Sequence, residues 1–230
     1  MPRPFPPAGW TDLLRQIVLF CGAYWLYRLV RGQGLGTFFE PALHAWATSQ
    51  GWIADFASWM YVNSHFAITT AALAFLYLRR NARFYFVRNM LMVAMAIALA
   101  GYAVFPTAPP RFLPELGFRD SVAAFAGVEA EAANVLFNPY AAVPSMHVAF
   151  ALMLGLPLAC MARHRWARVL WRGYPALVTF VVIATANHGW LDAFLEAATA
   201  AAAALAANGV LARARPEAWA WAPARWGSVI

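Results

Sequence analysis

Long runs of apolar residues, separated by short polar segments, occupy most of the chain. A membrane-spanning helix needs about 20 predominantly apolar residues. The runs predict six spans, at Leu13–Val30, Val62–Leu78, Asn89–Phe105, Ser145–Met161, Tyr174–Ala186 and Trp190–Leu211. The expected fold is therefore all-α: a polytopic six-transmembrane-helix bundle in which residues 1–230 form a single domain.

Two segments need a finer interpretation. The fifth run is short, so we expect its helix to begin near Trp171, with Pro175 in the first turn where a missing N–H is harmless. The segment Phe38–Met60 mixes several tryptophans with scattered polar residues. That pattern favours a helix lying in the membrane interface after the first span.

Composition excludes a soluble or disordered protein. Hydrophobic residues make up 63% of the chain and charged residues only 12%, against roughly 45–50% and 25% in soluble domains. The net charge of +7 could indicate nucleic acid, but the chain has no lysine and its arginines lie between apolar runs. We therefore expect the lipid bilayer, and no nucleic acid, as a partner.

The arginines also predict an orientation. Short cytoplasmic loops are enriched in positive charge. Most arginines, including those in Arg79–Arg88 and Arg163–Gly173, lie inside if both termini are cytoplasmic. The long loop Pro106–Pro144 and the turn Asn187–Gly189 then face the extracytoplasmic side.

The first group of candidate site residues lies where the fourth span begins. Pro144 suits a first helical turn, Ser145 suits a helix cap, and His147 follows one turn into the helix. A helix N-terminus that carries a hydroxyl and an imidazole favours an anion such as phosphate. Taken alone, Ser145 is better explained as a helix cap, and His147 is better explained by an interfacial position.

The second group is His188 and Asp192, four residues apart at the start of the last span. This spacing predicts that both lie on one helical face. A carboxylate that holds one ring nitrogen leaves the other as a nucleophile or base. The alternatives are a structural hydrogen-bonded pair or half of a metal site. Two ligands without a neighbouring cysteine are too few for a metal, and we expect none.

Other polar residues lie on the same predicted side. Arg111 follows three prolines after the third span and could present its guanidinium to phosphate oxygens, or could be a loop charge at the lipid headgroups. His65 could shape a headgroup pocket or make an interhelical hydrogen bond. Glu196, one turn beyond Asp192, could bind an acceptor hydroxyl.

At these residues the chain resembles the type 2 phosphatidic acid phosphatase superfamily. The shared motifs are Pro144-Ser145-Met146-His147 and a histidine followed four residues on by aspartate, His188-Gly189-Trp190-Leu191-Asp192. The segments Phe105–Arg111 and Asn138–His147 look like the branch that contains inositol phosphorylceramide synthase and its bacterial relatives. The resemblance covers about residues 61–205.

The resemblance implies roles for these residues. His188 would attack phosphorus to form a phosphohistidine, Asp192 would orient it, and His147 would protonate the leaving oxygen. Ser145 and Arg111 would bind phosphate oxygens, with no metal or other cofactor.

The chain departs from the family pattern in two motifs. It has no lysine for the first motif, and Val181 and Val182 stand where the third motif has Ser-Arg. Asn187, Asn138 and Arg111 are the nearest candidates to replace the missing arginine.

We therefore expect an integral membrane enzyme, in a bacterial inner membrane, that acts at the extracytoplasmic face. It would hydrolyse or transfer a phosphate ester of a membrane lipid, with water or with an alcohol or lipid acceptor. The alternatives are an inositol-phosphate type headgroup phosphotransferase and a non-enzymatic anionic-lipid-binding or transport protein.

Overall fold

The computed structural model describes residues 14, 39–104, 109–126 and 146–219. Every regular element in these ranges is helical, which confirms the all-α prediction there. The α-helices are α2 (Glu40–Ser49), α3 (Gly51–Trp59), α4 (His65–Arg79), α5 (Asn81–Val104), α6 (Ser121–Ala126), α8 (His147–Met161), α9 (Arg165–Ala184), α10 (Trp190–Leu205), α11 (Ala212–Ala214) and α12 (Pro216–Trp219). The same ranges contain π-helical segments η1 (Met60–Ser64) and η4 (Ala206–Leu211), and 3-10 turns η2 (Pro110–Phe112) and η3 (Pro114–Leu116).

Three helices in the described part of the chain are long and apolar enough to cross a membrane: Asn81–Gly101, Arg165–Ala184 and Trp190–Ala214. They correspond to the predicted third, fifth and sixth spans. Phe66–Arg79 and His147–Met161 are shorter apolar helices. The predicted first span lies outside the described residues except for Leu14, so the number six stays a prediction.

Two helices begin earlier than the apolar runs predict. Only Arg80, with φ −142° and ψ 45°, separates α4 from α5, so most of the predicted loop Arg79–Arg88 is helical. Helix α9 begins at Arg165, and the expectation that Pro175 occupies a first turn is wrong. The physical reason is that a helix continues past the apolar zone when long basic side chains extend toward water.

Inside α9, Pro175 creates a close contact with α8. Proline has no N–H to donate to the carbonyl of Trp171, four residues earlier. Gly155 of α8 packs at this carbonyl, and a Cβ on Gly155 would lie 2.7 Å from the Trp171 oxygen. Only glycine permits this approach, and small residues allow close packing of membrane helices in general.

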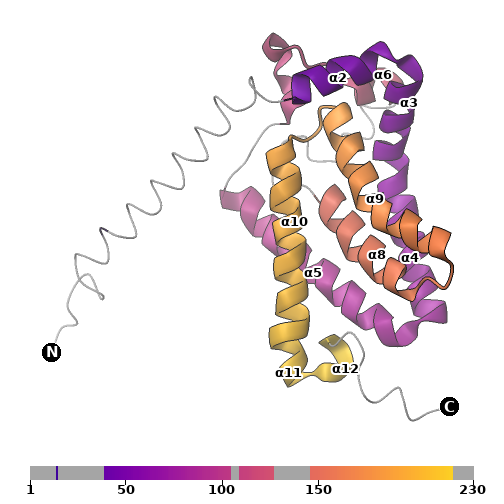
Figure 1. Cartoon of the computed structure of the whole chain (residues 1–230). Coiled ribbons are helices and arrows are strands. Elements are labelled where there is room, and N and C mark those ends of the chain that lie inside the picture. The colour runs from indigo at the N-terminus through magenta and orange to yellow at the C-terminus, as the bar shows by residue number, and fades with distance from the viewer. Residues whose placement is uncertain (1–13, 15–38, 105–108, 127–145, 220–230) are drawn as a thin grey trace.

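The segment predicted as one interfacial helix is two helices. Helix α2 ends at Ser49, whereas α3 continues through η1 into α4 and so begins a helical run that ends at Arg79. In Figure 1, α2 lies across the end of the bundle where α9 ends and α10 begins, and it packs against α9. This placement puts α2 beside the candidate site.

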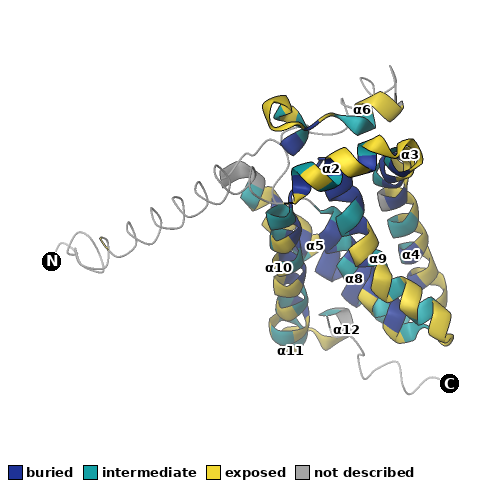
Figure 2. Cartoon of the chain, turned by 45° about the horizontal axis from the view of Figure 1, so that its top comes forward, coloured by how far each residue is buried: buried dark blue, intermediate teal, exposed yellow. Residues whose placement is uncertain are grey.

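The core lies between α4, α5, α8 and α10, where Leu76, Val87, Leu154 and Ala203 are fully buried. Figure 2 shows buried residues between the helices and exposed ones on the outer faces of α4 and α9. Many outer residues are nonetheless large and apolar, including Leu78, which is 74% exposed. An apolar exterior is what a bilayer requires.

Candidate active site

The turn between α9 and α10 holds two predicted site residues, Asn187 and His188. Helix α9 ends in a Schellman motif, in which the N–H of Asn187 donates to Val182 O (3.1 Å) and the N–H of Ala186 to Ile183 O (3.0 Å). Ala186 occupies the left-handed position with φ +55°, where glycine is usual. The turn buries both site residues, and His188 is 5% exposed.

Asp192 folds back toward His188 from the first turn of α10. The helix begins at Trp190 with Gly189 as an extended N-cap, so His188 precedes the helix. The expectation that His188 and Asp192 share a helical face is therefore wrong. The carboxylate still reaches the imidazole region, because Asp192 Oδ2 accepts the Gly189 N–H (3.0 Å) and lies 4.0 Å from His188 Nδ1. A carboxylate facing Nδ1 assigns any nucleophilic role to Nε2.

The structure brings His147 next to His188. His147 is the first residue of α8 rather than one turn inside it, and the two ring centroids are 5.7 Å apart with an interplanar angle of 42°. The ring of Tyr61 in η1 stacks on His147, with ring centroids 4.5 Å apart. Sequence reasoning did not single out Tyr61, because an aromatic residue in an apolar run gives no signal.

Arg111 carries positive charge to the same turn. Its backbone N–H donates to Ala186 O (2.9 Å), and its guanidinium donates to Asn187 Oδ1. Asp120 Oδ2 lies 3.4 Å from Arg111 Nε, and the arginine side chain is 14% exposed. Asp120, which the sequence did not indicate, thus helps to fix the guanidinium beside the residue that precedes His188.

The amide of Asn187 is engaged at both ends. Its oxygen accepts from Arg111, and its nitrogen donates to Thr185 Oγ1 at 2.9 Å. Asn187 is fully buried. The structure therefore places this residue as a bridge that orients Arg111.

Glu196 lies beneath the start of α8. The side chain is fully buried, and its Oε2 accepts the N–H groups of Val148 (2.6 Å) and Ala149 (3.2 Å). The sequence analysis predicted that the backbone N–H groups at the start of this helix favour phosphate. In the structure, two of these N–H groups donate to Glu196 instead. A carboxylate at this position supplies the negative charge that a helix N-terminus favours.

Helix α2 contributes two buried polar residues that sequence reasoning missed, Glu40 and His44. Glu40 Oε1 accepts the N–H of Trp190 (3.0 Å), and His44 Nδ1 lies 2.8 Å from Ala184 O. The available signal was a pair of titratable residues four apart in an otherwise apolar segment.

Three predicted site positions cannot be placed. Asn138 and Ser145 lie outside the described residues, and so does the side chain of His65, whose backbone begins α4. The predicted residues that the structure brings together are His147, His188, Asp192, Arg111 and Asn187, with Glu196 buried below them.

The chain matches the model of a known protein family. No curated protein and no solved structure matches the chain. The family model described as the PAP2 superfamily matches residues 25–207, which is most of the chain and includes the motifs around His147 and His188. The chain therefore belongs to the PAP2 superfamily, the type 2 phosphatidic acid phosphatase superfamily that its motifs resemble.

Proposed function

We propose that the protein is a membrane enzyme that cleaves or transfers a phosphate ester of a lipid, with His188 as the nucleophile. Members of the PAP2 superfamily are generally phosphatases or phosphotransferases. Its apolar helices and its family together indicate an integral membrane protein. The nucleophile, the lipid substrate and the independence from metal are our proposal.

The observation that carries this proposal is the setting of His188. The side chain is nearly buried, with the Asp192 carboxylate on its Nδ1 side and the His147 ring 5.7 Å away. Arg111 is fixed beside the preceding residue. A nucleophile, an orienting carboxylate, a second imidazole and a fixed positive charge are the parts that phosphoryl transfer needs.

In the first step, the lone pair of His188 Nε2 forms a bond to phosphorus as the bond from phosphorus to the lipid ester oxygen breaks. The electron pair goes to that oxygen, which takes a proton from the His147 imidazolium. Asp192 stabilises the positive charge that develops on the His188 ring. Arg111 neutralises phosphate oxygens.

In the second step, the hydroxyl of an acceptor attacks the phosphohistidine and gives its proton to His147. The P–N bond breaks, and its electron pair returns to Nε2. Water as acceptor gives a phosphatase, whereas an alcohol or second lipid gives a phosphotransferase. The resemblance of Phe105–Arg111 and Asn138–His147 to the inositol phosphorylceramide synthase branch favours an acceptor other than water.

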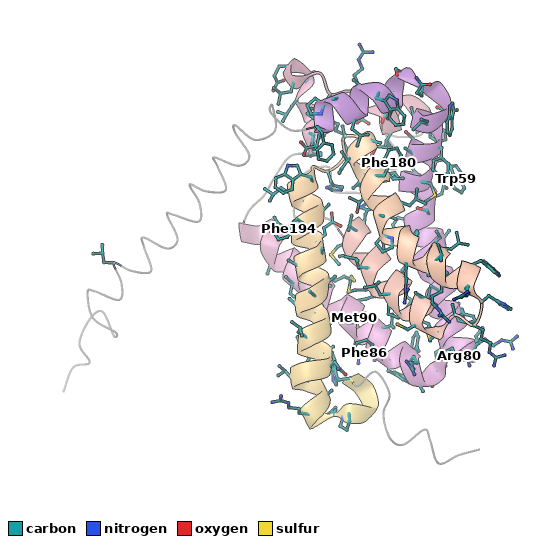
Figure 3. The ribbon with its side chains drawn as sticks, in the orientation of Figure 1. Trp59, Arg80, Phe86, Met90, Phe180 and Phe194 are labelled. Atoms are coloured by element: carbon teal, nitrogen blue, oxygen red, sulfur yellow. The ribbon has the colours of Figure 1, made fainter. Side chains whose placement is uncertain are left out.

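We place the site at the extracytoplasmic end of a six-span bundle with both termini cytoplasmic, in a bacterial inner membrane. Phe180 lies near the end of α9 that leads to His188, and Trp59 ends α3. Figure 3 supports the orientation, because Arg80 lies at the end of the bundle opposite these two residues. The positive-inside rule makes the Arg80 end cytoplasmic.

Cysteine labelling tests the orientation in a variant that lacks Cys21 and Cys160. Ser49 on α2 and His164 before α9 are both exposed. An impermeant reagent should label Ser49→Cys but not His164→Cys in intact cells. Labelling of His164→Cys alone would reverse the orientation.

The catalytic proposal is tested by turnover of purified protein in detergent with a chelator present. Substrates are diacyl and polyprenyl lipid phosphates, assayed for phosphate release and, with an added alcohol or lipid, for headgroup transfer. We expect turnover by the wild type and none by His188→Ala. His164→Ala, a histidine substitution at the opposite end, should retain full activity.

A trapped intermediate distinguishes the alternatives. Wild type quenched during turnover should carry an acid-labile, base-stable phosphate that His188→Ala lacks. Normal turnover by His188→Ala would refute the covalent mechanism. Binding of lipid phosphate without turnover in any assay would favour the anionic-lipid-binding or transport protein.

A further inference from the structure

The polarity of α2 is inverted relative to an ordinary surface helix. Glu40 and His44 are 2% and 1% exposed, whereas the neighbouring Phe39 and Trp46 are 55% and 50% exposed. Residues four apart lie on one helical face. Burying a carboxyl and an imidazole is unfavourable unless each makes hydrogen bonds, so the contacts of this face decide what it does.

Glu40 holds the backbone that follows His188. Its Oε1 accepts the N–H of Trp190, the first residue of α10. Asp192 accepts the preceding N–H, that of Gly189. Burial raises the pKa of the Glu40 carboxyl, an effect that the hydrogen bond from Trp190 opposes.

His44 holds the backbone that precedes the turn. Its Nε2 lies 3.1 Å from the N–H of Arg119, which can only donate, so this nitrogen is the acceptor. The proton is then on Nδ1, which donates to the carbonyl of Ala184, the last residue of α9. One ring thus connects the end of α9 to the loop that carries Arg111 and Asp120.

We propose that Glu40 and His44 are positioning residues for the nucleophile turn, residues 184–190, each fixing one side of it from α2. The proposal rests on the proposed function for its kinetic consequence, since it assumes that His188 reacts. Neither side chain is assigned a contact with substrate. Their effect is on the placement of His188 relative to His147 and Arg111.

The first test is kinetic. A 1 Å misplacement of a reacting group can lower a rate by about 100-fold. We expect Glu40→Ala to lower kcat by about 10- to 100-fold with KM within about twofold. Glu40→Gln, which keeps an acceptor oxygen for Trp190, should retain kcat. If Glu40→Ala fails to fold, His44→Phe, which keeps a ring but loses both hydrogen bonds, carries the same expectation.

The matched control is Thr48→Val on the same helix. Among the described residues, the Thr48 hydroxyl shares its proton between two carbonyls of α2 itself, those of His44 (2.8 Å) and Ala45 (3.1 Å). This variant should leave kcat and KM unchanged. A loss as large as that of Glu40→Ala would show that any damage to α2 lowers activity and would overturn the proposal.

The second test needs no activity, and it separates this proposal from the proposed function. Hydrogen exchange of a peptide covering residues 185–192 should be faster by about tenfold or more in Glu40→Ala than in wild type or Thr48→Val, because the Trp190 amide loses its acceptor and the turn loses its attachment to α2. Unchanged exchange would overturn the positioning role, whether or not the wild type turns over lipid phosphates. Loss of kcat in Glu40→Gln as large as in Glu40→Ala would also overturn it, since the carboxyl would then take part in the reaction itself.

Discussion

Helices α8 and α10 both begin beside a candidate catalytic histidine, and at both starts a carboxylate from another helix accepts backbone N–H groups. At α8 the carboxylate is Glu196, which is fully buried and binds two donors through one oxygen. At α10 it is Glu40, which binds one donor, and Asp192 within α10 binds another.

The difference lies in where each carboxylate comes from. Glu196 belongs to α10, so the start of α8 depends on the helix that follows His188. Glu40 belongs to α2, outside the three candidate spans. Helix α2 therefore fixes α10, and α10 fixes α8. The chain itself thus supplies a carboxyl acceptor for backbone N–H groups at each helix start.

Among the residues that hold the two helix starts, the largest effect is expected from Asp192→Asn. Asparagine keeps an oxygen that can cap Gly189, so the start of α10 should persist, but the negative charge facing His188 Nδ1 is lost. We expect kcat to fall by about 10²- to 10⁴-fold, with little change in KM, measured by phosphate release or headgroup transfer. An unchanged rate would remove Asp192 from the mechanism.

Glu196→Ala should have the next largest effect, and on stability as well as rate. The N–H groups of Val148 and Ala149 would lose their acceptor in a buried position, at about 1–3 kcal/mol for each. Glu196→Gln keeps the acceptor and loses only the attraction between charge and helix dipole, about 0.3–2 kcal/mol. Thermal unfolding in detergent should therefore rank wild type above Glu196→Gln and Glu196→Ala lowest.

A control for that series is Thr199→Val, a buried position on the same helix. It should lower Tm less than Glu196→Ala does. If the alanine variant unfolds at the wild-type temperature, α8 does not depend on α10 for its start.

The smallest effect is expected from Ala186→Gly. Ala186 has φ +55°, and a left-handed residue other than glycine costs roughly 1–2 kcal/mol. Glycine removes this strain but adds freedom to the unfolded chain, which offsets roughly 0.4–1 kcal/mol. A slightly higher Tm follows. Ala184→Gly, two residues earlier and helical, should instead lower Tm, and equal effects of the two changes would contradict the turn geometry.

Sequence alone located much of the candidate site because two motifs carry it. His147 and His188 were singled out by composition and spacing, and the structure places their rings together. The membership of the superfamily, inferred from those motifs, is confirmed. The roles assigned to these residues stay predictions.

The residues that hold the site were harder to predict. Glu40 and His44 bind backbone groups 150 and 140 positions away, and such contacts leave no local pattern. The starts of α5 and α9 were missed for a different reason, because a search for apolar runs stops at arginines that a helix readily includes at its end.

The π-helical segment η1 determines which residues of the helical run ending at Arg79 lie on the side of the candidate site and which lie on the side of the core. A π-helical stretch accommodates an extra residue within a helix, and one residue turns an α-helix by about 100°. Residue Tyr61 in this stretch meets His147, while Leu76 beyond it faces the core. A one-residue deletion within Met60–Ser64 would rotate the two halves against each other, so insertions and deletions here change which face meets the site, whereas most substitutions do not.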